Sequence, residues 1–332
     1  MILVRAPLRI SFIGGGTDIP DFYRTSKGSV ISTTIKQYVY LAIKHSKYVN
    51  KIIVKYSTTE IVDHPKHLLH NRVRESLHLL GIENSIEIGS FASIPARTGL
   101  GSSSSFTVAL IRGLHHYKGI NISNDQIAHK ACVIEIEKLK EPIGKQDQYA
   151  SAFGGFNIIT FHPNEDVDVE PVKIPKENLK LFEDSILLFF TGMTRDASSV
   201  LAKQKLNISA RVKLYKKMIS FIKPFNQALI KGDIKRAGQI LHATWIVKKK
   251  FEKDISNKVI DDLYSVGIKS GAWGGKILGA GGGGCLLFIA PQKKKNLIRE
   301  NISKFSKNYK LTGFAEIPVE FENRGVEIVF EE

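Results

Sequence analysis

The sequence predicts an α+β protein built from two domains. The chain has 332 residues, of which 43% are hydrophobic, so it can bury more than one domain-sized core. Strand-like runs dominate the first 60 residues, and helical patterns mixed with further strands follow them. Residues 162–180 form a polar stretch that contains proline. We therefore place the boundary there, with an N-terminal domain at 1–175 and a C-terminal domain at 176–332.

The elements of the N-terminal domain follow from residue type and spacing. Short runs of β-branched or aromatic residues between turn residues predict strands. Apolar residues at helical spacing predict helices at 67–80 and 126–140, and another helix that begins near Ser104. The predicted strands are 2–4, 9–13, 28–34, 38–43, 52–56, 85–90 and 156–161.

The C-terminal domain reads as a sandwich of helices and strands. An apolar run at 185–191 predicts its first strand. Two long, lysine-rich amphipathic helices are predicted at 197–231 and 234–249. A glycine-rich loop then leads into a buried strand at 285–290, and two more strands are predicted within 319–330. No internal repeat is visible.

The charge of the chain is strongly positive, at +16. The excess is mostly lysine, with short runs at 248–250 and 293–295 that we interpret as solvated faces. No nucleic-acid-binding module is recognisable around these segments, so we expect no nucleic-acid partner. A basic surface also suits a protein that captures polyanionic small molecules.

Other features of the composition indicate the compartment. No apolar run approaches the roughly 20 residues of a membrane span, so we expect no membrane segment. We also expect no signal peptide, because charge interrupts the opening MILVRAPLR and no small-residue cleavage site follows. Two isolated cysteines, Cys132 and Cys285, fit a reduced, cytoplasmic compartment. Monomer and homodimer both remain open.

The segment PARTGLGSSSSF at 95–106 is the strongest functional signal. Gly99 and Gly101 can take positive φ, so the backbone can turn tightly with its N–H groups toward a ligand. The helix that follows would place its N-terminus, which favours phosphate, at Ser102 or Ser103. The segment is not a Walker A loop, because it has no lysine where that motif requires one. The alternative is a turn that caps an ordinary helix.

Two further glycine-dense segments occur, and together the three segments resemble the motifs of a known family. They are RAPLRISFIGGGTD at 5–18 and KILGAGGGGC at 276–285. All three resemble, in order, the motifs of the GHMP small-molecule kinases, over nearly the whole chain. This resemblance implies an N-terminal domain like the second domain of ribosomal protein S5 and a ferredoxin-like C-terminal domain. It also implies ATP and Mg²⁺ as cofactors, with the active site between the domains.

The resemblance implies a catalytic pair. Asp147, in GKQDQY, matches the family's catalytic aspartate, which holds the acceptor hydroxyl in line or accepts its proton. Arg9 matches the arginine that neutralises developing charge and keeps that aspartate ionised. Without the motifs, Asp147 would be a helix N-terminal carboxylate and Arg9 a strand-face arginine. The phosphate loop would bind ATP through Pro95, Gly99, Leu100, Gly101, Ser102, Ser103 and Ser104.

A metal site is implied on the same loop. Glu135 resembles the family's Mg²⁺-binding glutamate, and Ser103 would be its partner, since carboxylate and hydroxyl oxygens suit Mg²⁺. Glu137 competes for this role. Residues two apart on a helix lie about 200° apart, so only one of the two glutamates can point at the site.

The expected acceptor is a sugar. Gly15, Gly16, Thr17 and Asp18 stand where relatives carry sugar-binding groups, although an Asx-capped turn is the alternative. Glycines of the third motif would let that loop approach the substrate closely. A phosphate on the sugar needs a further cation. For this cation we prefer Arg195, in TGMTRDAS, over Lys145 and Arg97. The third-motif glycines that would contact the substrate are Gly281, Gly282 and Gly283.

The resemblance therefore implies a sugar-1-kinase. Within the family, GGGTD followed by IPDFY, and GKQDQYASAFGG at 144–155, are most similar to kinases that phosphorylate the anomeric hydroxyl of D-glycero-D-manno-heptose 7-phosphate, for nucleotide-activated heptose of surface polysaccharide. One rival is a kinase for an unphosphorylated sugar such as fucose. Another is a sugar- or ATP-binding regulator that has lost catalysis.

Overall fold

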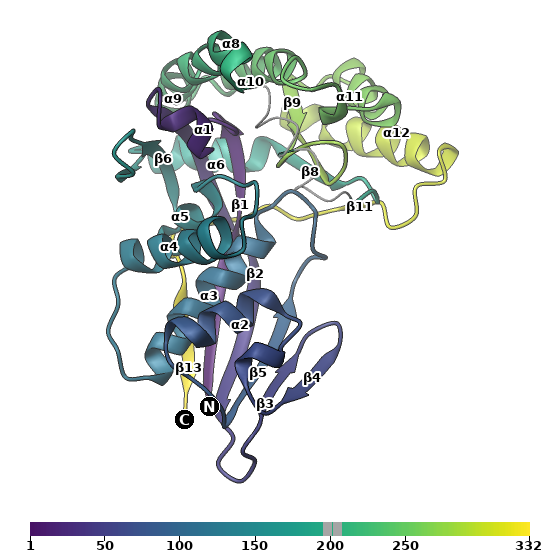
Figure 1. Ribbon diagram of the computed structural model, residues 1–332. Coiled ribbons are helices and arrows are strands. Elements are labelled where there is room, and N and C mark those ends of the chain that lie inside the picture. Colours follow the sequence, from purple (N-terminus) through teal and green to yellow (C-terminus); the bar gives the residue numbers. More distant parts are fainter. Residues whose placement is uncertain (195–200, 202–207) are drawn as a thin grey trace.

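The computed structural model describes residues 1–194, 201 and 208–332. Within these residues the larger sheet has nine strands, in the order β13-β1-β2-β5-β3-β4, while β6 and β12 also pair with β2, and β7 pairs with β6 (Figure 1). The pairing is antiparallel except between β3 and β5. The strands are β1 (Ile2–Ile13), β2 (Gly28–His45), β3 (Ile52–Lys55), β4 (Thr59–Val62), β5 (Ile86–Ala92), β6 (Phe156–Phe161), β7 (Val167–Pro171), β12 (Phe321–Glu322) and β13 (Glu327–Glu331).

Helices cover one side of this sheet. The central helix α3 packs on β1 and β2, and α5 packs beside it on the same strands. The N-cap of α3 is Gly101, in the left-handed conformation, and the helix begins at Ser102, so the cap lies just before the predicted Ser102 or Ser103. The helical elements of this domain are α1 (Pro20–Tyr23), η1 (Pro65–His67), α2 (Asn71–Leu79), α3 (Ser102–Tyr117), α4 (Asn124–Cys132), η2 (Val133–Lys138) and α5 (Gln146–Phe153).

Two long strands replace four predicted short ones. β1 continues through the predicted break at Pro7, and β2 continues through the predicted break near Ile35. The register shifts between Pro7 and Leu8, which is the kind of bulge that accommodates a proline inside a sheet. The turn residues of the sequence therefore mark an irregularity within β1 and not the end of a strand.

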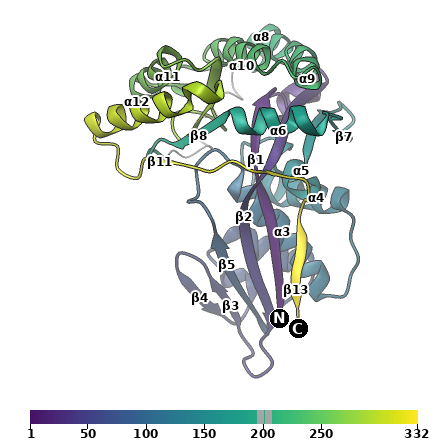
Figure 2. The ribbon, with the colours of Figure 1, turned by 180° about the vertical axis from the view of Figure 1, so that it is seen from behind.

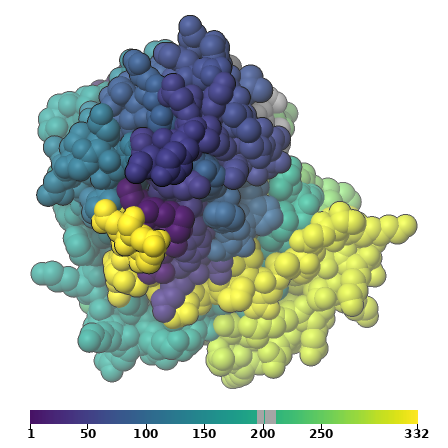
Figure 3. All heavy atoms as spheres, turned by 90° about the horizontal axis from the view of Figure 1, so that it is seen from below, coloured from purple at the N-terminus to yellow at the C-terminus, as the bar shows by residue number. Residues whose placement is uncertain are grey.

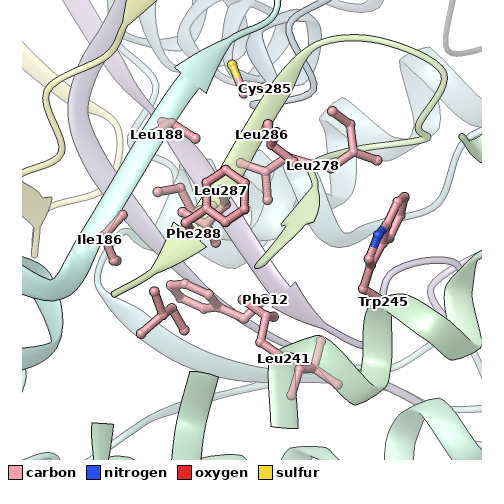
Figure 4. Close-up of a cluster of buried hydrophobic side chains, with 14 of the residues drawn as sticks. Phe12, Ile186, Leu188, Leu241, Trp245, Leu278, Cys285, Leu286, Leu287 and Phe288 are labelled. Carbon is pink, nitrogen blue, oxygen red and sulfur yellow. The ribbon is translucent and has the colours of Figure 1, made fainter. Parts of the chain in front are cut away.

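The C-terminal domain has its own antiparallel sheet, in the order β11-β8-β10-β9. Helix α10 packs on β9 and β10, and α11 packs on the same two strands. Figure 4 shows the apolar side chains between helix and sheet, including Trp245 and Leu241 from α10 and Leu286 to Phe288 from β10. The elements are α6 (Lys176–Ser185), β8 (Ile186–Phe190), α8 (Ile208–Ser220), α9 (Ile222–Ile230), α10 (Ile234–Lys248), η3 (Lys253–Ile255), α11 (Lys258–Lys269), β9 (Gly274–Ile277), β10 (Cys285–Ile289), η4 (Gln292–Lys294), α12 (Lys295–Asn308) and β11 (Ala315–Glu316).

Strand β1 joins the two cores. Its first half, with Val4 and Ala6, is buried in the N-terminal core. Its second half, with Leu8, Ile10 and Phe12, is buried in the core shared with the C-terminal domain. Phe12 lies among these C-terminal side chains in Figure 4. Arg9 lies next to the point where the strand passes from one core to the other, between the buried Leu8 and Ile10.

The C-terminal end corrects the expected division of the chain. Two strands do occur within 319–330, but β12 pairs with β2 and β13 pairs with β1, so both belong to the N-terminal sheet. Figure 2 shows this yellow segment running back along the molecule, and in Figure 3 it lies beside the purple N-terminus. The open edge of β1 gains a hydrogen-bonded partner in this way. The range 176–332 is thus not a single structural unit.

Other predictions also need correction. Within the described residues, the predicted helix at 197–231 is two helices, α8 and α9, which meet at Phe221. The polar stretch at 162–180 contains β7 and the start of α6, and the sequence reasoning missed α11 and α12. Two lysines from the runs interpreted as solvated are buried: Lys248 is 5% exposed and Lys295 is 8% exposed.

Candidate active site

The N-terminal and C-terminal domains meet at two glycine loops. A Cβ on Gly99 would lie 2.7 Å from the carbonyl oxygen of Leu278, and a Cβ on Gly279 would lie 2.7 Å from the Cα of Gly99. Both residues have positive φ, at 82° and 67°. The backbone N–H of Cys285 also donates to the carbonyl of Thr98 at 2.9 Å. Only glycine permits this approach, so the loop at 95–101 and the loop at 278–284 form one joined surface.

Arg9 and Asp147 form a bidentate pair at this junction. Arg9 Nε donates to Asp147 Oδ1 at 2.8 Å and Nη2 donates to Oδ2 at 2.9 Å. Nη1 donates to the carbonyl of Gly99 at 2.6 Å, and the backbone N–H of Arg9 donates to the carbonyl of Leu100 at 3.0 Å. The Arg9 side chain is 4% exposed and that of Asp147 is 24% exposed. One guanidinium thus orients the carboxylate and shapes the glycine loop together.

A polar cavity of about 340 Å³ opens in front of this pair. Asp147 stands close to the phosphate loop, because a Cβ on Gly101 would lie 3.4 Å from Asp147 Oδ2. The cavity brings together many of the predicted site residues of the N-terminal domain, while the described C-terminal residues that line it, such as Lys248 and Gly279, were not predicted. Those that line it are Arg9, Gly15, Gly16, Asp18, Arg97, Gly99, Gly101, Ser102, Ser103, Ser104 and Asp147.

Asp18 is the buried acid of this cavity. Its carboxylate accepts from the backbone N–H of Gly16 at 2.9 Å and from that of Gln146 at 3.3 Å. Burial, together with the negative charge of Asp147, raises the pKa of the Asp18 carboxyl above its ordinary value. The bond from Gly16 is the Asx-type turn that was the alternative to a sugar-binding role, and that role stays a prediction.

Sequence reasoning missed two lysines that line the cavity. Lys248 Nζ donates to the carbonyl of Gly279 at 2.9 Å, and Lys276 Nζ donates to the carbonyls of Ser11 and Phe12 at 3.0 and 2.9 Å. The sequence contained a signal for the burial of Lys248. This residue follows Leu241, Thr244 and Trp245 of α10 at spacings of three and four residues, so it could have been assigned to the same buried helix face.

A second cavity lies on the other side of Ser102 and Ser103. It measures about 590 Å³, and these two serines and Arg72 line both cavities. Its wall is mostly apolar or aromatic and includes Pro95. Among the described lining residues, Arg72 is the only one that carries a formal charge at neutral pH, apart from the titratable ring of His70. The described lining residues also include Val39, Tyr56, Phe91, Ala92, Ile94 and Phe106.

The predicted metal ligand Glu135 is bonded to an arginine. Glu135 is fully buried, and its oxygens accept from Arg72 Nε at 2.9 Å, Thr107 Oγ1 at 2.9 Å and Gln148 Nε2 at 2.6 Å. Arg72 also donates to Glu141 at 2.6 Å. Of the two candidate glutamates, Glu135 is buried while Glu137 is exposed. Both lie in η2, a π-helix, which replaces the end of the predicted regular helix.

The donor set fits Mg²⁺ at Ser103, whose exposed hydroxyl lines the cavity. Mg²⁺ in kinases is held by one or two protein groups together with substrate phosphates and water. Glu135 lines neither cavity as described, and both of its oxygens accept hydrogen bonds from protein groups, so a metal would have to replace one of these bonds. Residues 1–194, 201 and 208–332 contain no cluster of three or more His, Cys, Asp or Glu side chains able to hold a metal by themselves.

Several predicted substrate residues lie away from the polar cavity. Thr17 is fully buried, and its hydroxyl donates to the carbonyl of Ser29 at 2.9 Å. Lys145 donates to Glu165 Oε2 at 2.6 Å. Gly281 to Gly283 line neither cavity as described, and the N–H of Gly282 donates to the carbonyl of Ile255 at 2.9 Å. Leu100 is fully buried, and Arg195 lies outside the described residues.

Family models match the two halves of the chain. The model described as "GHMP kinases N terminal domain" matches residues 67–155, which hold the phosphate loop and Asp147. The model described as "GHMP kinases C terminal" matches residues 225–308, which hold Lys248 and the third glycine loop. No helix that the structure describes is both long and apolar enough to span a bilayer.

Several individual relatives are named as sugar kinases, and others as mevalonate kinases. The chain is 30% identical to a D-glycero-alpha-D-manno-heptose 7-phosphate kinase of Campylobacter jejuni, over 90% of this chain and 92% of that protein. It is 26% identical to a galactokinase of Pyrococcus furiosus, over 92% and 95%. A crystal structure named as a D-glycero-D-manno-heptose 1-phosphate kinase from Bacteroides thetaiotaomicron has the same fold, with a TM-score of 0.77, 23% identity and full coverage of both chains.

Proposed function

The chain belongs to the GHMP family of ATP-dependent kinases, and we propose that its acceptor is the anomeric hydroxyl of D-glycero-D-manno-heptose 7-phosphate. One observation carries the proposed chemistry. The Arg9–Asp147 pair lines the polar cavity beside the phosphate loop, because Arg9 donates both to Asp147 and to the loop carbonyl of Gly99. An acceptor in that cavity would meet the γ-phosphate of a nucleotide on the loop next to a carboxylate.

ATP would span the two cavities. The N–H groups at the start of α3 and the hydroxyls of Ser102 and Ser103 would hold the phosphates, because a helix N-terminus favours anions. The base would enter the apolar cavity, where Tyr56 and Phe106 offer aromatic surface. The two serines line both cavities, so the triphosphate would cross from one to the other beside them.

Asp147 would act on the acceptor hydroxyl. Its carboxylate is held in one orientation by two bonds from Arg9, so a hydroxyl bound to it would be fixed in line with the γ-phosphate. Asp147 then accepts the proton of that hydroxyl as the oxygen attacks phosphorus. Arg9 stabilises the negative charge that develops on the transferred group.

Mg²⁺, held by Ser103 and Glu135, would neutralise phosphate charge when bound with ATP. Arg72 donates to Glu135, which would have to bind the metal, and it lines both cavities. If a metal replaced Arg72 on Glu135, the guanidinium of Arg72 could contact the phosphates instead.

The choice of a heptose phosphate rests on the relative from Campylobacter jejuni and on charge. Arg97 lines the mouth of the polar cavity, is exposed, and has no ion pair among the described residues. Arg195 remains our candidate for the phosphate on the sugar. If it reads that phosphate, Arg195→Ala raises KM for the sugar phosphate and leaves KM for ATP unchanged.

The test is ATP consumption with Mg²⁺ over a panel of acceptors, with products identified by phosphorus NMR. The panel contains D-glycero-D-manno-heptose 7-phosphate, mannose 6-phosphate, fucose, galactose, mevalonate and homoserine. A new anomeric phosphate signal with the heptose phosphate alone supports the proposal. Preference for fucose or galactose keeps the kinase and overturns the substrate. No turnover, with ATP still bound, would favour a regulator.

A further inference from the structure

Lys248 has an unusual place for a lysine. It is the last residue of α10, is 5% exposed, and lines the polar cavity. Its Nζ lies 3.5 Å from where a Cβ on Gly15 would stand, so it approaches the first glycine loop from the C-terminal domain. It does not line the apolar cavity. Lys248 is therefore on the acceptor side of the phosphate loop.

The ammonium group of Lys248 is only partly satisfied by protein. It has three N–H donors, and among the described residues it donates to one acceptor, the carbonyl of Gly279. Lys276 faces the same cavity but donates to two carbonyls. The unused donors of Lys248 lie in a cavity large enough for a ligand.

The charges around Lys248 do not make it a structural ion pair. Asp147 is engaged in two bonds with Arg9, and Asp18 accepts from backbone N–H groups. Burial and the positive charge of Arg9 outweigh the opposing charges of Asp18 and Asp147, and together these effects lower the pKa of Lys248 to about 8. A buried cation without a partner is costly for the folded state, so its position calls for a functional reason.

We propose that Lys248 binds the acceptor sugar by donating hydrogen bonds from its ammonium group to an oxygen of the sugar held beside Asp18. This inference rests on the proposed function, because it takes the polar cavity as the sugar site. Asp18 would accept from sugar hydroxyls and Lys248 would donate to a sugar oxygen. The two domains would then each supply one polar contact to the same substrate.

The first test compares Lys248→Met with Lys250→Met, which removes an exposed lysine two residues further along the chain. Binding of D-glycero-D-manno-heptose 7-phosphate to the full chain is measured by calorimetry without ATP, and KM is measured for both substrates. For Lys248→Met we expect sugar binding roughly 10- to 100-fold weaker, as for loss of a charge-assisted bond, with KM for ATP unchanged. Lys250→Met should match the wild type in both.

Stability separates a binding role from a structural one. Replacing an unpaired buried cation by an apolar side chain of similar length should leave the midpoint of thermal unfolding unchanged or raise it. A fall in that midpoint, with equal losses for sugar and ATP, would assign Lys248 a structural role and overturn the proposal. Unchanged sugar binding in Lys248→Met would overturn it as well.

A pH profile supplies a further readout. The charged form of Lys248 is lost as pH rises through about 8, so sugar binding by the wild type should weaken between pH 7 and 9. Lys248→Arg, which stays charged, should lack this limb. Lys276 also lines the cavity, and burial lowers its pKa well below the ordinary value, so it could produce a similar pH dependence. If the loss of sugar binding above pH 7 persists in Lys248→Arg, it comes from another group, and that result counts against the proposal.

The two proposals fail in different ways. If wild-type protein prefers another sugar of the panel, the proposed substrate is wrong, and the same variants are compared with that sugar. If the wild type binds no sugar at all, both proposals are wrong. If the wild type binds the heptose phosphate and all three variants bind it equally well at every pH, only the assignment of Lys248 is wrong.

Discussion

The two cavities that meet at Ser102 and Ser103 are built differently. The polar cavity draws charged side chains from both domains, including Arg9, Asp18 and Lys248. The apolar cavity is lined by the N-terminal domain alone, and Arg72 is its one strongly basic residue among those described. A cavity that must position reacting groups needs charges held from several directions, whereas one that holds a flat base needs mainly apolar surface. The difference supports chemistry in the first and nucleotide anchoring in the second.

The largest effect should come from the centre of the polar cavity. Asp147→Asn keeps the shape of the side chain but removes its charge and its capacity to accept a proton. We expect turnover to fall by roughly 10²–10⁴ while ATP and sugar still bind. Steady-state kinetics with calorimetric binding of each substrate would measure this. Turnover close to the wild-type value would remove Asp147 from the catalytic role.

The junction between the cavities should respond next. Glu135→Gln weakens the buried bonds to Arg72, Thr107 and Gln148, and we expect a loss of about 2 kcal/mol in the free energy of unfolding. It should also raise the Mg²⁺ concentration needed for half-maximal activity. Glu137→Gln is the matched control. Because Glu137 is exposed, this variant should change the free energy of unfolding by no more than about 0.5 kcal/mol. Equal effects of the two variants would contradict the special role of Glu135.

The apolar cavity can be filled from its edge. Ala92 is exposed on β5 and lines this cavity, so Ala92→Trp places a large ring in the proposed space of the base. We expect KM for ATP to rise at least about tenfold, equivalent to roughly 1.4 kcal/mol of binding, with KM for the sugar unchanged. Ala92→Ser, which leaves the space open, should behave as the wild type. A larger change for the sugar than for ATP would reverse our assignment of the two cavities.

The smallest effect should come from Lys145, which lies outside both cavities. Lys145→Met should change KM for the sugar by less than about twofold and, because the Lys145–Glu165 pair is partly exposed, should cost under about 1 kcal/mol of stability. A large, selective rise in KM for the sugar would restore Lys145 to the substrate site.

The same variant has a signature in acid. Burial alone would raise the pKa of the Glu165 carboxyl, but hydrogen bonds from Lys145, Tyr23 and Arg24 lower it to about 2. A lowered pKa stabilises the fold above the ordinary value of 4.5, and this contribution is lost as pH falls from there toward about 2. Unfolding measured over this range should show a smaller loss in Lys145→Met than in the wild type.

The parts of the site that are local in sequence could be predicted from the sequence. The glycines of the phosphate loop and the helix that begins behind them depend on backbone freedom and on spacing within a dozen residues, which the chain displays directly. The motifs identified Arg9 and Asp147, and the structure joins them by two hydrogen bonds across 138 positions of sequence. The family assignment followed from the same residues.

Tertiary structure decided the rest. We expected Lys248 on a solvated face and Lys145 near the substrate phosphate, but packing buries the first in the polar cavity and directs the second to Glu165. Arg72 reaches Glu135, and β13 returns to pair with β1, only because the sheet and helices bring distant segments together. A side chain's neighbours across the fold are set by the packing of whole elements, which no local pattern records. The sequence thus determined the phosphate loop and its chemistry, and the packing of the two domains decided which charges surround the substrate.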